Sequence, residues 1–177
     1  SGCSGFSGGL HIPESVTSIG HGAFSDCSGL NGELHIPESV TSIDDFVFSG
    51  CSGLTSVAIG NSVTSIGNSA FENCSSLTSI SIPESLTTIN NHTFEGCTNL
   101  KTAKLHDGIT SIGGYAFFNY DCLTGSLHIP ETVTSIGEFA FNYCSFLTSV
   151  TIPESVTSIG NFAFAKCTSL EAVTIGE

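Results

Sequence analysis

The chain has 177 residues, of which 40% are hydrophobic and 11% are charged, and its formal net charge at pH 7 is −13. Its fixed cations are Lys101, Lys104 and Lys166, and it contains no arginine. This balance excludes binding to the phosphate backbone of nucleic acids and to an anionic membrane surface, while the apolar content indicates a packed core rather than a disordered chain. The apolar runs are only a few residues long, so we expect no membrane insertion.

A pattern of 23 or 24 residues recurs about seven times along the chain. Two columns that keep this spacing are Ile19, Ile43, Ile66, Ile89, Ile112, Ile136, Ile159 and Phe24, Phe48, Phe71, Phe94, Phe117, Phe141, Phe164. A fixed period of this length is the signature of a solenoid, in which each unit buries its apolar side chains against its neighbours. We therefore predict a single solenoid over residues 1–177. Because the chain begins within a unit and neither end resembles a polar cap, we expect a truncated piece of a longer array, able to associate end to end.

Each unit is predicted to contain four successive elements, as in residues 147–169. Residues 147–152 alternate apolar and polar side chains, which predicts a strand that pairs in parallel with the equivalent strands of other units. A proline then ends pairing, and residues 155–159 form a second short extended piece. A glycine, aspartate or asparagine follows, and each tolerates the left-handed conformation that a sharp corner needs. Apolar spacing in residues 161–167 predicts one helical or 3₁₀ turn over the core.

Three junctions between units carry an additional residue and a glycine, at Gly8, Gly32 and Gly125. A glycine within a strand, accompanied by one added residue, predicts a β-bulge.

Seven of the eight cysteines occupy one column of the repeat, which consists of Cys3, Cys27, Cys51, Cys74, Cys97, Cys144 and Cys167. A cysteine that recurs with the apolar core is expected to pack there as a small buried side chain. Cys122 departs from this column, because Tyr120 takes the column position in its unit. If any thiol is exposed and reactive, we expect it to be Cys122.

The recurring unit, IPESVTSIGxxAFxxCxxLTSVxI, closely resembles the BspA-like, or Treponema pallidum-type, leucine-rich repeat over essentially the whole chain. The resemblance implies a right-handed solenoid with a parallel β-sheet on its concave face. It also implies a protein at the cell surface or secreted, acting as a non-enzymatic adhesion module for an extracellular protein or glycan. Local departures from the pattern occur at Asp44, Asn90, Tyr120 and residues 104–106.

The expected concave face consists mostly of threonine and serine, and two of the three cations stand out on its central unit. Lys101, Thr102 and Lys104 are therefore candidate partner-binding residues, which would anchor a carboxylate or sulfate group. The alternative is a pair of solvated lysines, the ordinary state of an exposed charge.

A second candidate surface comes from the position just before the recurring Ala-Phe pair. This slot holds Gly22, Phe46, Ser69, His92, Tyr115, Phe139 and Phe162. Its last three members are aromatic, and Phe118, Tyr143 and Phe146 lie nearby in the sequence, so we predict an aromatic binding patch on the outer surface. The alternative is that these rings only cover the turns beneath them.

Other site chemistry has little support in the sequence. His11, His35 and Glu33 share one face of neighbouring strands, but their spacing is unlike that of a zinc site, and we predict no metal or cofactor. The serines lie in no nucleophile-elbow pattern, so we predict no enzyme activity. Two alternative functions remain, a structural spacer within a larger surface protein and an ice- or crystal-binding array formed by the Thr-Ser columns.

Overall fold

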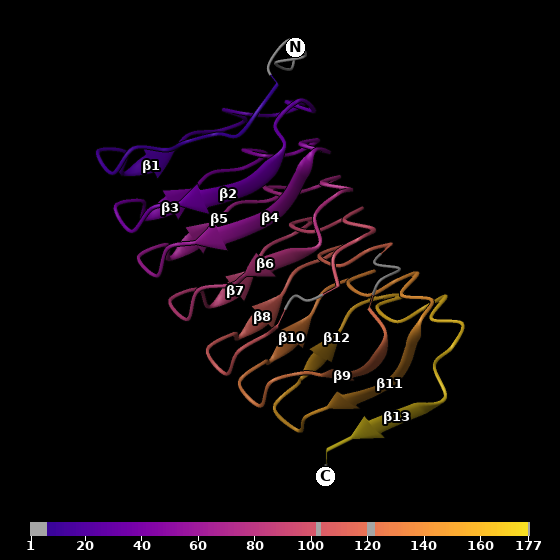
Figure 1. The fold of residues 1–177 in the computed structure, drawn as a ribbon. Helices are drawn as coiled ribbons and strands as arrows, with labels where there is room; N and C mark the ends of the chain where they lie inside the picture. Colours follow the sequence, from indigo (N-terminus) through magenta and orange to yellow (C-terminus); the bar gives the residue numbers. More distant parts are fainter. Residues whose placement is uncertain (1–6, 102–103, 120–122, 177) are drawn as a thin grey trace.

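The computed structural model describes residues 7–101, 104–119 and 123–176, and its units stack in chain order (Figure 1). One set of parallel strands, here called the long-strand ladder, consists of β2 (Gly32–Ile36), β4 (Leu54–Ile59) and β6 (Ser79–Ser81), then β9 (Gly125–His128), β11 (Leu147–Ile152) and β13 (Ala172–Ile175). The short-strand ladder consists of β1 (Ser18–Ile19), β3 (Ser42–Ile43) and β5 (Ser65–Ile66), then β7 (Thr88–Ile89), β8 (Ser111–Ile112), β10 (Ser135–Ile136) and β12 (Ser158–Ile159). The first and last strands, β1 and β13, lie at opposite ends of the stack.

The pairing register confirms that one column of the sequence becomes one row of side chains in space. Ile19 lies opposite Ile43, and Ile43 lies opposite Ile66. The structure is thus a parallel β-solenoid of about seven turns. In the unit that contains Lys101 and Lys104, no strand among the described residues joins β6 to β9, so the long-strand ladder is divided there into two three-stranded sheets.

A continuous row of phenylalanine rings runs through the core, together with buried leucine, isoleucine and valine side chains. Phe48, Phe71, Phe94, Phe117 and Phe141 are each at most 2% exposed. Neighbouring rings in this row stack, with centroids 5.2–6.1 Å apart. Full burial of one such ring stabilises the fold by about 1.5–3 kcal/mol before entropy is subtracted.

The cysteine column lies beside this row and is buried in every described unit except the last, where Cys167 is partly exposed. From Cys51 onward, each described thiol of the column donates a hydrogen bond to a phenylalanine carbonyl of the preceding unit, as from Cys74 Sγ to Phe48 O at 3.2 Å and from Cys97 Sγ to Phe71 O at 3.1 Å. The prediction of a buried structural column is confirmed for these residues.

The irregular strands expected at the glycine junctions are present at two of the three, Gly32 and Gly125, whereas Gly8 forms only an isolated bridge to Leu30. The register shifts where Gly32 pairs with β4 and where Gly125 pairs with β11. Both glycines have a positive φ, 79° and 80°, which a side chain rarely tolerates.

The predicted helical or 3₁₀ turns are wrong, because the described residues contain turns but no helix. In the unit of Tyr115, the N–H groups of residues 115, 117 and 119 donate to the carbonyls of Glu138, Ala140 and Asn142 in the next unit. Left-handed φ values recur at Tyr115 and Asn119, four residues apart, and interrupt any helical path. The segment is therefore a hydrogen-bonded turn ladder between units. No helix of the described part is long and apolar enough to span a bilayer.

The glycine at the corner was predicted to supply a left-handed backbone conformation, but it does not. The left-handed residue lies two positions later, as at Gly22 and Ser69. Gly137 is instead required by close packing, since a Cβ there would lie 2.3 Å from the Gly114 nitrogen of the preceding unit.

Candidate binding surface

The slot before the Ala-Phe pair has the same left-handed backbone in every unit. Its φ is 60° at Gly22 and 55–59° at Phe46, Ser69, His92, Tyr115, Phe139 and Phe162. This conformation suits glycine or asparagine, and a bulky side chain there costs roughly 1 kcal/mol or more. The inter-unit bond from the slot N–H, 2.9 Å long from Tyr115 to Glu138 O, holds the conformation in place. Every slot side chain therefore leaves the turn in the same direction.

Consecutive aromatic side chains in this slot stack on one another. Ring centroids are 4.8 Å apart for His92 and Tyr115, 4.7 Å for Tyr115 and Phe139, and 5.0 Å for Phe139 and Phe162. The interplanar angles are 10°, 20° and 25°. The sequence-predicted residues Tyr115, Phe139 and Phe162 are thus brought together, and the row gains His92, which the sequence placed in the slot but not in the predicted patch.

Two further rings join this row from the same turn segment. Phe118 is tilted against Tyr115, with ring centroids 5.3 Å apart, and forms a T-shaped contact with Tyr143 at 5.7 Å. We call the six residues His92, Tyr115, Phe118, Phe139, Tyr143 and Phe162 the aromatic strip. Phe146 is also exposed, but no ring contact connects it to the strip among the described residues.

The strip is open to solvent, unlike the phenylalanine row of the core. Phe162 is 63% exposed and Tyr143 is 48% exposed, while Tyr115 and Phe139 are half-buried. Phe46 shares the slot conformation and is 40% exposed, but Ser69 separates it from the strip. Phe46 contacts His21 instead, at 5.5 Å between ring centroids.

The turn segments that carry the strip include two acidic residues, Glu95 and Glu138. His92 Nδ1 lies 2.5 Å from Glu95 Oε2, the one salt bridge within the part of the chain that the structure describes. Glu138 follows the glycine corner directly before Phe139 and is exposed. The strip therefore combines apolar rings with carboxylates.

The lysine candidates occupy a different part of the molecule. Lys101 and Lys104 are exposed, and neither forms an ion pair with a described carboxylate; Thr102 lies outside the described residues. Lys104 lines a hollow of about 570 Å³ together with Glu84, Leu105, His106, Asp107, Gly108 and His128. This hollow lies where the long-strand ladder is divided. It is lined by acidic as well as basic side chains.

The imidazole of His106 is fixed at this hollow. The Gly108 N–H donates to His106 Nδ1, and His106 Nε2 lies 3.0 Å from Pro83 O. Since Nδ1 accepts, Nε2 carries the proton and donates to the carbonyl. His106, which stands in the proline column, thus links its own unit to the preceding one.

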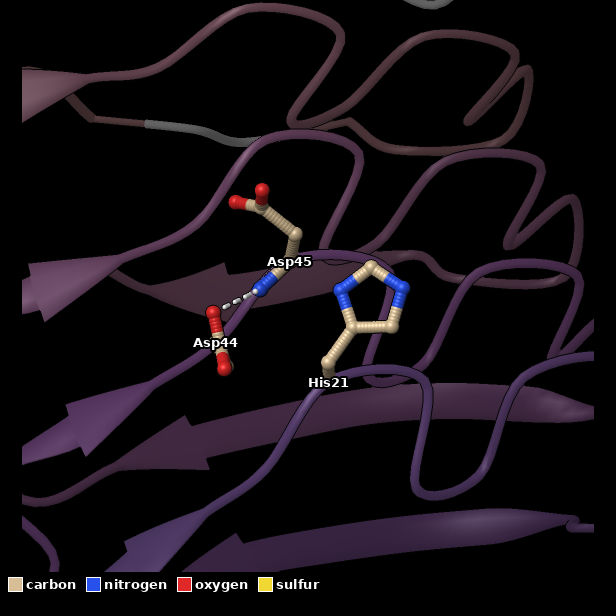
Figure 2. A group of neighbouring side chains, drawn as sticks. All are labelled: His21, Asp44 and Asp45. Carbon is tan, nitrogen blue, oxygen red and sulfur yellow. Dashed lines mark hydrogen bonds between the residues drawn. The ribbon is translucent and has the colours of Figure 1, made fainter.

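One group of potential metal ligands was not predicted from the sequence. His21, Asp44 and Asp45 place one ligand atom each within 4.8 Å of one another (Figure 2). The Asp45 N–H donates to Asp44 Oδ1, and Asp45 Oδ1 accepts a 2.6 Å bond from the Asn68 N–H. Both carboxylates therefore already accept hydrogen bonds from backbone N–H groups of the turns. Asp45 occupies the column that holds asparagine in the next two units, Asn68 and Asn91. The group is not assigned as a metal site.

The threonine column on the surface is also bonded within the fold. Thr110, Thr134 and Thr157 each donate their hydroxyl proton to the carbonyl of the preceding threonine, over 3.1–3.2 Å. These hydroxyls can then only accept hydrogen bonds from outside. This bonding does not favour an ice-binding array.

The thiols differ in their readiness to ionise. Burial raises the pKa of Cys97 to about 12 and raises the pKa of Cys74 well above its usual value. The neighbouring Cys144 lowers the pKa of Cys167, which is partly exposed. Cys122, the thiol singled out in the sequence, lies outside the described residues.

Comparison with known proteins adds a family to this geometry. The model of the BspA type leucine rich repeat region matches residues 3–124 and 118–177, in six copies. A search of curated proteins returned no match. No catalytic family is indicated by the matches.

Several solved structures are similar to the chain. A leucine-rich repeat protein of Treponema pallidum is 25% identical with a TM-score of 0.67, and the match covers 78% of each chain. One from Eubacterium ventriosum is 28% identical with a TM-score of 0.77, covering 88% of this chain and 41% of that one. A leucine rich cell surface protein of Faecalibacterium prausnitzii is 29% identical with a TM-score of 0.57, covering 95% and 48%. The chain thus spans less than half of the last two proteins.

Proposed function

Because the chain belongs to the BspA-type leucine-rich repeat family, we propose that it is a non-enzymatic binding module, displayed at a cell surface or secreted, that recognises an extracellular partner. The similar protein from F. prausnitzii is described as a cell surface protein, which supports the location. Leucine-rich repeats generally bind proteins, which supports the class of activity. The partner itself is a protein or a glycan.

The aromatic strip is the observation that carries this proposal. Four of its rings, those of His92, Tyr115, Phe139 and Phe162, occupy a left-handed backbone position that Ser69 and Gly22 fill elsewhere in the chain at nearly the same φ. The fold can therefore be built without aromatic residues in this slot, and local strain at functional sites is a recurring feature of proteins. Exposed tyrosine and phenylalanine side chains are also favoured anchors of protein interfaces.

The experiment that tests the proposal is a binding screen of the purified chain against extracellular matrix proteins and glycans. The variant Tyr115→Ser/Phe139→Ser/Phe162→Ser removes three rings of the strip. Phe46→Ser is its control, because Phe46 occupies the same backbone position away from the strip. We expect the strip variant to lose binding and Phe46→Ser to retain it.

Lys101, Thr102 and Lys104 remain the second proposed contact, with an anionic group of the same partner. Lys101→Glu/Lys104→Glu tests them in the same screen. If only this variant lost binding, the partner-binding surface would lie on the side of the long-strand ladder rather than at the aromatic strip. Absence of binding by the unmodified chain would favour the role of a structural spacer.

Self-association is a second proposed activity, because apolar side chains are open at the C-terminal end of the stack. Ile159, Val173 and Ile175 are 46%, 54% and 65% exposed. Stacking against a second copy would cover them and pair the open edge of β13. Sedimentation velocity should detect association that increases with concentration and is abolished by Val173→Glu/Ile175→Glu. A strictly monomeric chain at all concentrations would contradict it.

A further inference from the structure

The two central rings of the aromatic strip, Tyr115 and Phe139, are stacked on both sides, so their edges rather than their faces are open to a partner. Tyr115 has His92 against one face and Phe139 against the other, with interplanar angles of 10° and 20°. Phe139 is similarly enclosed between Tyr115 and Phe162. In the strip, Phe162 is the last ring of this stack, and it is the most exposed.

This orientation selects the chemistry of a partner. The face of an aromatic ring carries the negative part of its quadrupole and the edge carries the positive part. A sugar ring that stacks on an aromatic residue requires an open face, which Tyr115 and Phe139 do not offer. Ring edges instead favour peptide carbonyl oxygens and the faces of a partner's own aromatic rings, in edge-to-face contacts.

The charges around the strip also restrict the kind of partner that can bind. Glu95 contacts His92, the exposed Glu138 directly precedes Phe139 in the chain, and the chain as a whole carries a net charge of −13. A field of this sign accelerates the approach of cationic partners and opposes anionic ones. Lys166 is the one fixed cation in the unit of Phe162.

We propose that the aromatic strip binds a cationic protein segment that carries aromatic side chains, and not a carbohydrate. The partner's rings pack against the strip edges, while its lysine or arginine side chains pair with the exposed carboxylate of Glu138. This inference rests on the proposed function and specifies its partner.

Two kinds of probe test this choice by fluorescence or calorimetric titration of the full chain. The first is a short synthetic peptide of alternating arginine and tryptophan, with an arginine–alanine peptide of equal charge as its control. The second is a pair of neutral oligosaccharides, chitohexaose and cellohexaose. The protein variants are Tyr115→Ser/Phe139→Ser/Phe162→Ser, Phe46→Ser and Glu138→Gln.

We expect the arginine–tryptophan peptide to bind at least tenfold more tightly than the arginine–alanine peptide. The strip variant should weaken this binding at least tenfold, Glu138→Gln should weaken it severalfold, and Phe46→Ser should leave it unchanged. Urea midpoints of all variants are recorded alongside, and a native fold is expected because Ser69 occupies the same backbone position naturally.

Three results would overturn the inference. Equal affinity of the peptide for the unmodified chain and the strip variant would mean that charge alone binds it. Failure of the arginine–tryptophan peptide to bind the unmodified chain would also overturn the inference. Oligosaccharide binding that disappears in the strip variant would identify a carbohydrate surface, and would leave the proposed function standing while refuting this choice of partner.

Discussion

The slot residues Tyr115, Phe139 and Phe162 hold a backbone conformation that their side chains disfavour. Local propensity would place glycine or asparagine there, and Gly22 fits that expectation at a φ of 60°. The sequence revealed the order of the aromatic residues, because a fixed period brings equivalent positions to one row. It could not reveal the left-handed φ or the ring angles, since both depend on hydrogen bonds between units that are distant in sequence.

The cysteines allow a test of burial at single residues. Cys167 is partly exposed and its pKa is lowered, whereas Cys74 and Cys97 are buried with raised pKa values. Since the thiolate is the reactive form, iodoacetamide at neutral pH should modify Cys167 well before Cys74 or Cys97. Peptide mapping by mass spectrometry over time measures the order, with the urea-unfolded chain as the control in which all three react. Equal rates in the folded chain would show that the core opens readily.

The same burial predicts a loss of stability in alkali. The pKa of Cys97 rises from 9.0 to about 12 on folding, so the folded state keeps a proton that the unfolded state loses in this range. The contribution of this thiol is fully present below pH 9.0 and is lost as pH rises toward about 12. Each such group lowers the unfolding free energy by up to about 1.4 kcal/mol per pH unit there. Urea unfolding at a series of pH values measures the slope, which Cys97→Ala should reduce; an unchanged slope would contradict the assignment.

Among the elements, the strands could be predicted and the turns could not. Alternation in residues 147–152 and the proline at 153 fix the end of β11, and the observed strand is Leu147–Ile152. The helical turn was predicted from apolar spacing within one unit, which carries no information about bonds to the next unit. The observed bonds from Tyr115 and Phe117 to Glu138 and Ala140 satisfy donors that a helix would have used internally.

The corner glycines give a prediction at the scale of the turn. Gly137→Ala should destabilise the fold by about 1–3 kcal/mol, because its Cβ would meet backbone atoms that cannot move aside. Gly20→Ala is the matched control in the same column, as a Cβ there meets nothing within 4 Å and should leave stability equal or slightly higher. Urea unfolding of the two variants measures the difference. Equal effects would indicate that the corner backbone adapts.

For the whole molecule, charge is the least balanced property. The chain has a net charge of −13 and a single salt bridge among its described residues. Added salt therefore stabilises the fold by screening charge repulsion more than it destabilises the fold by screening ion pairs. Its melting temperature should therefore rise as sodium chloride is increased from low to moderate concentration. Scanning calorimetry measures this trend, and a falling melting temperature would show that attractive contacts dominate.

The most direct test of the account concerns Phe162, measured in Phe162→Asn for both stability and binding of the arginine–tryptophan peptide. Asparagine accepts the left-handed backbone, and the ring it replaces is 63% exposed, so we expect the unfolding free energy to change by no more than about 1 kcal/mol. Peptide affinity should nevertheless fall severalfold. For comparison, Phe141→Ala in the core should cost about 3–5 kcal/mol. If Phe162→Asn instead lowered the unfolding free energy by about 3–5 kcal/mol and left peptide affinity unchanged, the strip would only cover the turns beneath it. That result would contradict its role in binding.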